Sequence, residues 1–112
     1  MKVVNAFEAP EPQNVHGVSA RPLHDNEHVQ VSMVTLRPGE KLRRHITPVD
    51  VFFYVLEGRG VVEIGEEEQG VVADQLIDSP AGIVHRLRND GDSVFRFLVV
   101  KTPRPTGPTK VL

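Results

Sequence analysis

The feature that most constrains this chain is a run of β-branched and aromatic residues at positions 51–56, VFFYVL. The run follows a Pro–Gly turn at positions 38–39 and a basic stretch at 41–45, and it stops just before Gly58. A short apolar run bounded by turn signals predicts a β-strand. Because successive side chains of a strand point to opposite faces, both faces of this strand are apolar and both need cover.

The rest of the sequence repeats this pattern of short apolar segments separated by glycine, proline and acidic turns. No segment shows a sustained helical period, so many closely spaced short strands predict an all-β sandwich or small barrel. We expect hairpin turns at residues 65–68 and 89–92, the second of them joining the last two strands. The expected strands cover residues 1–5, 15–23, 28–36, 51–57, 61–64, 71–73, 75–78, 84–88 and 94–101.

The length of 112 residues predicts a single domain. We assign residues 1–101 to one barrel together with its N-terminal strands. Residues 102–112 contain three prolines and a glycine, and we expect them to form a loosely held tail. The doubly apolar strand at 51–56 then needs cover from the N-terminal segment or from a second subunit, which predicts a homodimer.

Composition argues against several classes of partner and site. The net charge of −2 gives no electrostatic case for nucleic acid or an anionic membrane surface, and there is no tryptophan for stacking on single strands. The absence of cysteine excludes disulfides, thiolate metal sites and a cysteine nucleophile. No segment resembles a signal peptide or a membrane span, so we expect a cytoplasmic location with neither nucleic acid nor a membrane as partner.

Two segments carry histidines at regular distances from glycines. In the first, Gly39 is followed after five intervening residues by His45, then after one by Thr47, after three by Val51 and after six by Gly58. This spacing resembles the first motif of the cupin superfamily, which has a second histidine in the place of Thr47 and a glutamate in the place of Val51.

The second segment matches the second cupin motif in order and spacing. Asp74 takes the place of the motif's glycine, and Pro80, Gly82, His85 and Asn89 follow at the family's intervals. Two motifs in sequence, covering about residues 29–101, make the chain similar to a small single-domain cupin. The resemblance implies an all-β double-stranded β-helix, or jelly-roll barrel.

The family's metal site uses two histidines and a glutamate from the first motif and one histidine from the second. The chain keeps only His45 and His85 of these four, since neither Val51 nor a neutral Thr47 hydroxyl is a good ligand. A catalytic divalent site normally has three protein ligands and an open position, so two imidazoles are expected to hold a metal poorly. Two alternatives stay open: a Zn, Ni, Mn or Fe ion bound by His45 and His85 with a repaired ligand, or no cofactor. The candidates for that repair are Asp50, His24 and His28.

The resemblance implies a barrel that binds a small polar molecule, and it leaves open whether the chain is an enzyme. One alternative is a metal-dependent oxygenase, isomerase or lyase, and another is a metal-free ligand-binding or regulatory protein. A third is a metal-free acid–base enzyme in which Asp50 orients a histidine. Both histidines could also form a hydrogen-bonded pair with no ligand, and His16 is interpreted as a loop residue. The ligand-binding residues expected in the barrel are Thr47, Asp50, Val51, Phe53 and Leu87.

Overall fold

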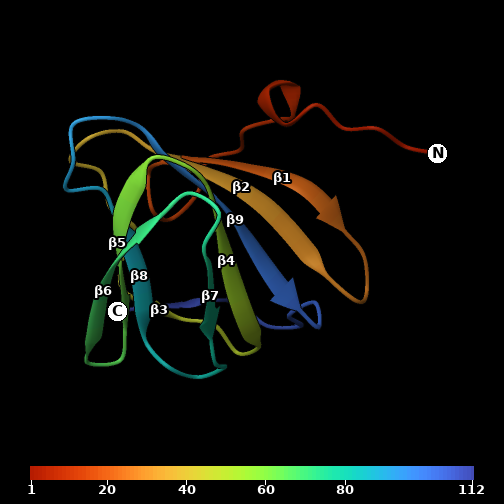
Figure 1. The fold of residues 1–112 in the computed structure, drawn as a ribbon. Helices are drawn as coiled ribbons and strands as arrows, with labels where there is room; N and C mark the ends of the chain where they lie inside the picture. Colours follow the sequence, from red (N-terminus) through yellow and green to blue (C-terminus); the bar gives the residue numbers. More distant parts are fainter.

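The computed structural model describes residues 1–112 and contains two five-stranded sheets that face each other (Figure 1). This confirms the all-β jelly-roll barrel, and no helix of the structure is long and apolar enough to cross a membrane. One sheet has the order β1 (Ser19–Asp25), β2 (Gln30–Leu36), β9 (Phe95–Thr102), β4 (Asp50–Glu57) and β7 (Leu76–Ser79). The other has the order β10 (Lys110–Val111), β3 (His45–Ile46), β8 (His85–Arg88), β5 (Arg59–Ile64) and β6 (Glu67–Val72).

The core lies between the two sheets, and β4 crosses its middle. Val51, Phe53 and Val55 point inward and are at most 3% exposed, whereas Phe52, Tyr54 and Leu56 on the other face are only half-buried. A single chain therefore does not fully bury both faces of β4. One packed sheet covers one face of its partner, and the outward face of β4 has only side-by-side neighbours in its own sheet.

Two glycines allow β4 and β5 to turn closely around the aromatic core. Gly58 has φ +78°, and a Cβ atom there would lie 2.1 Å from the carbonyl oxygen of Val94. A Cβ atom at Gly60 would lie 2.1 Å from the ring of Phe95, which is fully buried. Glycine fits both positions because it has no side chain, and at Gly58 it also adopts positive φ without strain.

The segment at residues 89–92 is not the expected hairpin. β8 pairs with β3 and β5, whereas β9 pairs with β2 and β4, so these residues carry the chain from one sheet to the other. Asn89 is 1% exposed, and its amide donates hydrogen bonds to the carbonyl oxygens of Leu36 (2.9 Å) and Ser93 (2.8 Å). These residues do form a turn, but the pairing of the strands on either side depends on contacts between residues that are far apart in the sequence.

Both ends of the chain also differ from expectation. Residues 1–5 form no strand, and a short 3-10 turn, Ala6–Glu8, follows them. The proline-rich tail is not loose at its end, because Lys110–Val111 pair with β3 and the amide of Leu112 donates to the carbonyl of Arg44 (2.9 Å).

The acidic turn expected at residues 65–68 is shorter in the structure, since β6 already begins at Glu67.

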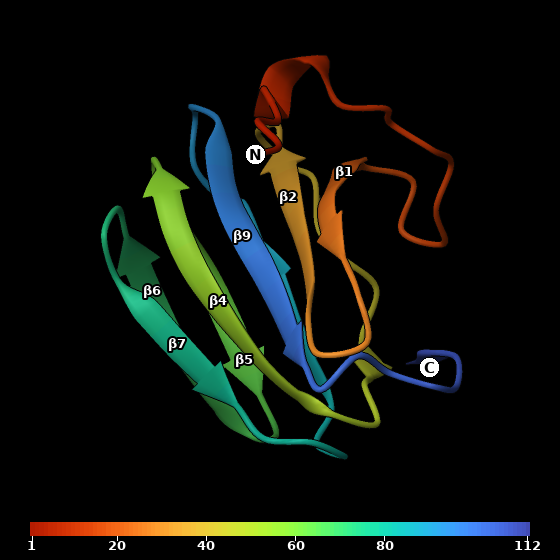
Figure 2. The same ribbon diagram turned by 90° about the vertical axis from the view of Figure 1, so that its right-hand side faces the viewer.

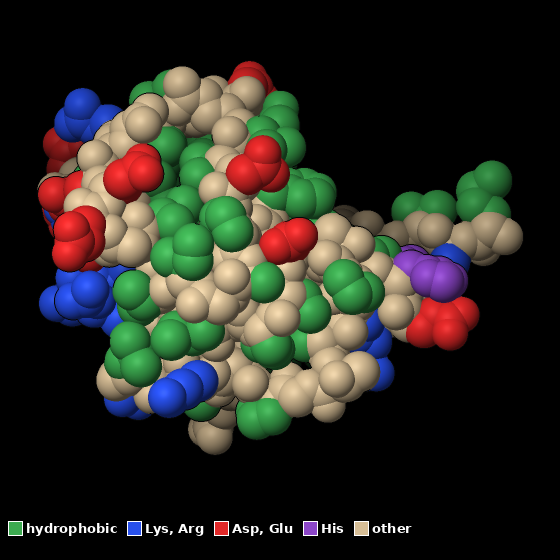
Figure 3. Space-filling model, turned by 90° about the horizontal axis from the view of Figure 1, so that it is seen from below, with side chains coloured by type: hydrophobic (Ala, Val, Ile, Leu, Met, Phe, Trp, Pro, Cys, Tyr) green, Lys and Arg blue, Asp and Glu red, His purple; other side chains and the backbone are tan.

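Two further views show how the layers are closed. In Figure 2 the sheet containing β4 faces the viewer, and the N-terminal segment lies near the end of β2. In Figure 3, hydrophobic side chains gather across the centre of the lower end of the barrel, and most charged side chains lie towards its rim. The buried residues are mostly apolar, with His45, His85, Thr47, Ser79 and Asn89 as the buried polar ones.

Candidate functional site

Two histidines from the two sequence motifs meet inside the barrel. His45 on β3 and His85 on β8 are directly opposite each other in an antiparallel pair, so their side chains lie on the same face. They are 6% and 3% exposed, and their Nε2 atoms lie 3.0 Å apart. The structure thus brings together the two candidate metal ligands through one strand pairing.

The hydrogen-bond partners of these rings define their tautomers. The Nδ1–H of His45 donates to the carbonyl of Arg43 (2.7 Å), so Nε2 of the neutral ring accepts a hydrogen bond from Nε2–H of His85. Nδ1 of His85 in turn accepts from the hydroxyl of Ser79 (2.6 Å). Ser79 belongs to β7 in the opposite sheet, so this chain of hydrogen bonds links both sheets. The Thr47 hydroxyl lies 3.3 Å from Nε2 of His85.

Burial keeps these imidazoles neutral. Desolvation lowers the pKa of His85 to about 3, with smaller contributions from the charges of His45, Lys101 and His16. Burial also lowers the pKa of His45, against the hydrogen bond to the Arg43 carbonyl, which acts to raise it. The pair therefore carries no positive charge near neutral pH, and each ring can both donate and accept one hydrogen bond.

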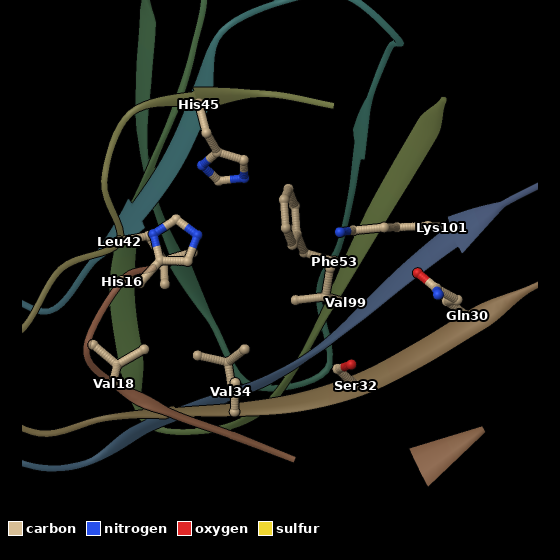
Figure 4. Close-up of a pocket in the computed structure, with 11 residues that line it drawn as sticks. His16, Val18, Gln30, Ser32, Val34, Leu42, His45, Phe53, Val99 and Lys101 are labelled. Carbon is tan, nitrogen blue, oxygen red and sulfur yellow. The ribbon is translucent and has the colours of Figure 1, made fainter. Parts of the chain in front are cut away.

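Beside this pair lies a partly open cavity of about 130 Å³ (Figure 4). An apolar cavity of about 150 Å³ is known to hold benzene, so this cavity is of similar size. In Figure 4 the side chains of His16, His45 and Lys101 project towards a common space beside the ring of Phe53. The lining residues are His16, Val18, Ala20, Gln30, Ser32, Val34, Leu42, His45, Phe53, Val99 and Lys101.

His16, interpreted from the sequence as a loop residue, is part of this wall. Its Nδ1 accepts a hydrogen bond from the backbone N–H of Arg43 (2.8 Å), and its ring packs edge-on against His45 with centroids 4.8 Å apart. Burial lowers the pKa of His16 to about 4, helped by the charges of His45, Lys101 and Arg43. No local sequence signal marks this residue, because it lies outside both motifs and precedes β1.

Lys101 also lines the cavity and was not among the expected site residues. A sequence signal for it existed, because it continues the alternation of Phe95, Phe97 and Val99 along β9. Phe95 and Phe97 are fully buried in the core, and the same parity directs Lys101 inward. The alternation would have identified a lysine on the inward face of an otherwise apolar strand.

The expected ligand-binding residues are placed differently from one another. Phe53 lines the cavity, whereas Thr47 and Val51 do not line it and are buried at 1% and 3% exposure. Leu87 is fully buried in the apolar core and does not line the cavity. Asp50 is exposed, and its Oδ1 accepts the backbone N–H of Ala81 (2.9 Å), so it holds a loop in place and does not enter the cavity.

The donors present do not fit the metal site of the four-ligand pattern. The hydroxyls of Thr47 and Ser79 contact His85 and the ring of His16 packs against His45, but no three His, Asp or Glu side chains are placed to hold one metal ion. The candidate replacements His24 and His28 are exposed, as is Asp50. Two imidazoles that hydrogen-bond directly to each other fall short of the three ligands of a typical catalytic centre.

The comparisons with known proteins agree with this architecture. The sequence pattern of the cupin domain matches residues 32–101. Polyketide synthase CurC of Streptomyces cyaneus is 34% identical over 80 residues, covering 70% of this chain and 52% of that protein. The uncharacterised protein YrkC of Bacillus subtilis is 30% identical over 108 residues, covering 90% of this chain and 56% of that protein. The chain thus spans about half the length of these curated relatives.

Solved structures match over almost the whole chain. TT1209 from Thermus thermophilus is 30% identical with a TM-score of 0.80, covering 94% of this chain and 100% of that chain. The polyketide cyclase RemF from Streptomyces resistomycificus has a TM-score of 0.82 at 21% identity, covering 100% of this chain and 85% of that chain, and shows likeness of fold alone. With both motifs, the barrel and the matching domain pattern in place, the chain belongs to the cupin domain family.

Proposed function

We propose that this cupin binds a small organic molecule with one or more oxygen acceptors in the cavity between its sheets, and does so without a metal. The observation that carries the proposal is the chemistry of the lining. It contains the imidazoles of His16 and His45, the amine of Lys101 and two further polar side chains, but no carboxylate. Hydrogen-bond donors without an acid favour a neutral or anionic oxygen-bearing ligand over a cation.

The rest of the lining describes the carbon part of the ligand. Six of the eleven lining residues are hydrophobic, with the Phe53 ring and the branched side chains of Val34 and Val99 among them. Small-molecule sites typically combine such an apolar wall with a few polar groups that orient the ligand. A cavity of about 130 Å³ suits a single ring or a short chain.

A second candidate function is acid–base conversion of the bound molecule. Its support is the neutral, half-buried imidazole of His16 at the cavity wall, because Arg43 occupies only its Nδ1 and leaves Nε2 to exchange a proton with the bound molecule. CurC and the tetracenomycin protein TcmJ of Streptomyces glaucescens, 30% identical over 76 residues, are described as polyketide synthase proteins. This second candidate function implies a substrate with several carbonyl groups, such as a polyketide. No step of it passes through a metal.

The binding proposal is tested by titrating phenol, cyclohexanone and pentane-2,4-dione into isotope-labelled protein. We expect amide shifts in the residues that line the cavity. Ala20→Leu fills part of the cavity and should weaken binding at least about tenfold, or about 1.4 kcal/mol. Ser19→Leu is the matched control, because Ser19 neighbours Ala20 on β1 and does not line the cavity. Equal binding by both variants, or shifts confined to other surfaces, would contradict the proposal.

A further inference from the structure

Lys101 differs from every other lysine of the chain in its surroundings. The chain has four lysines, and Lys2, Lys41 and Lys110 are exposed, whereas Lys101 is half-buried. Its side chain extends from β9 into the cavity towards the ring of Phe53 (Figure 4). A long, flexible amine has therefore been placed where the bound molecule would lie.

No acid neutralises this amine. All ion pairs of the chain use arginine or histidine as the cation, and no Asp or Glu lines the cavity. Burial lowers the pKa of Lys101, and no carboxylate opposes this effect. A lysine with a depressed pKa holds more free amine at neutral pH, and the free amine is the nucleophilic form.

We propose that Lys101 is a nucleophilic amine that forms an imine with an aldehyde or ketone carbonyl of the molecule held in the cavity. This inference rests on the proposed function, and it narrows the ligand class from oxygen-bearing molecules to those with a reactive carbonyl. It also gives Lys101 a covalent role in place of that of a fixed positive charge.

The formation of this imine balances without a co-reactant. The nitrogen lone pair of Lys101 attacks the carbonyl carbon, a C–N bond forms, and the carbonyl oxygen takes up a proton to give a carbinolamine. The C–O bond then breaks and the oxygen leaves as water, so that the two amine protons end, in net balance, on that water. His16 lines the same cavity and is the group that can relay these protons, because the backbone N–H of Arg43 occupies only its Nδ1.

The test uses pentane-2,4-dione, a small β-diketone whose adduct with an amine is an enaminone that absorbs in the near ultraviolet. The intact chain is incubated with the diketone near neutral pH, and the modified residue is identified by peptide mass spectrometry. We expect a single adduct at Lys101, with a mass gain of one diketone less one water. Burial lowers the pKa of Lys101 and the cavity holds the diketone beside its amine, so Lys101 should be modified faster than the exposed Lys41.

Two variants control the experiment. Lys101→Met removes the amine while keeping a linear apolar side chain, and it should abolish the near-ultraviolet signal with the amide spectrum of a folded barrel intact. Lys41→Met removes an exposed lysine and should leave the signal unchanged. Similar reaction rates at all four lysines would overturn the proposal.

The same samples separate this inference from the binding proposal. Cavity amide shifts with pentane-2,4-dione in the absence of an enaminone would overturn the imine role of Lys101 and leave ligand binding in place. Neither shifts nor an adduct would overturn both. Loss of those shifts in Lys101→Met, with no adduct in the unaltered chain, would assign Lys101 to charge or hydrogen bonding and also overturn the imine proposal.

Discussion

At the scale of single residues, two substitutions account for the character of the site. Thr47 and Val51 stand at the positions where the cupin motif has a histidine and a glutamate, and both are almost fully buried. With those two ligands missing, His85 bonds to His45 and Ser79. Each ring nitrogen of the pair then has a partner within the chain, which satisfies the rule that buried polar groups are hydrogen-bonded.

The buried histidines predict a loss of stability in mild acid. His85 has a pKa of about 3 in the folded chain against 6.5 for an ordinary histidine, so between these values only the unfolded chain binds the proton. Its contribution is therefore fully present above pH 6.5 and is lost as the pH falls towards 3. One such histidine lowers the free energy of unfolding by about 1.4 kcal/mol per pH unit.

Urea denaturation at about pH 7 and about pH 5 measures this effect. His85→Gln should reduce the loss between the two pH values by about 2 kcal/mol, since glutamine does not titrate. His24→Gln is the matched control, because His24 is exposed on β1. A loss of stability that is the same in the unaltered chain and in His85→Gln would show that His85 becomes protonated within the folded barrel.

At the scale of elements, the site depends on where a few strands cross. β3 is only two residues long, yet it brings His45 opposite His85 on β8. Val51 on β4 is the cross-strand partner of Ser79 on β7, whose hydroxyl contacts His85. Of the two positions that lack a metal ligand, Thr47 follows β3 and its hydroxyl contacts His85, and Val51 on β4 lies opposite Ser79.

This arrangement predicts that a metal site can be rebuilt. The double variant T47H/V51E provides three imidazoles and a carboxylate, a set that suits borderline ions such as zinc or nickel. Without metal the variant should be less stable than the unaltered chain, because Val51→Glu places a carboxylate in a wall that is 3% exposed. With metal at about 100 times its dissociation constant, binding should restore about 2.7 kcal/mol.

Thermal melts with and without zinc or nickel, together with elemental analysis of untagged protein, measure the outcome. If the variant folds but its melting temperature does not change when metal is added, positions 47 and 51 do not converge with His45 and His85 on one metal site. Equally tight binding by the unaltered chain would show that it contains a third ligand that the structure does not bring together.

At the scale of the whole molecule, the outward face of the β4 sheet forms an apolar surface across several strands. Strand register places Met33, Leu98, Tyr54 and Leu76 in one row. Val31, Val100 and Phe52 form the next row. Met33 is 1% exposed but Leu76 is 53% exposed, so cover is complete at the β2 end and incomplete at the β7 end.

The N-terminal segment accounts for that difference. Arg96 on β9 lies over the ring of Phe7, 5.0 Å from its centroid, and Arg21 on β1 donates to the carbonyl of Ala9 (2.5 Å), so side chains of β1 and β9 hold this segment. Figure 2 shows it there, with β4 and β7 left open to the viewer. Met1 and Val3 are fully or largely exposed. An apolar arm and an apolar sheet face on one chain suit a twofold arrangement in which each covers its counterpart.

We therefore expect a homodimer formed through the open β4–β7 face. Light scattering at micromolar concentration should give twice the chain mass, and Leu76→Arg should shift the population to monomer by placing a charge in the interface. Ile83→Arg is the matched control, because Ile83 is also an exposed hydrophobic residue but lies outside this sheet. A monomer at these concentrations in the unaltered chain would contradict the expectation.

The sequence by itself determined the class of fold and the two histidines. Apolar runs of strand length between glycine and proline turns predict short strands, and the motif spacing around His45 and His85 resembles that of cupins, which implies a barrel. These are local properties, since periodicity, turn preference and residue spacing are all read along the chain. The alternation of Phe95, Phe97, Val99 and Lys101 is also a local property, and it could have identified Lys101, which the sequence analysis did not select.

Only the tertiary structure decided the remainder, because it depends on pairs of residues far apart in the sequence. His16 reaches the cavity through a hydrogen bond to Arg43, 27 residues away, and His85 meets His45, 40 residues away. The residues around Asn89 favour a turn, and this turn would suit a hairpin equally well. Because β8 pairs with β5, the turn instead carries the chain from one sheet to the other. Such contacts arise when the two sheets close on each other, and no local preference of the chain encodes them.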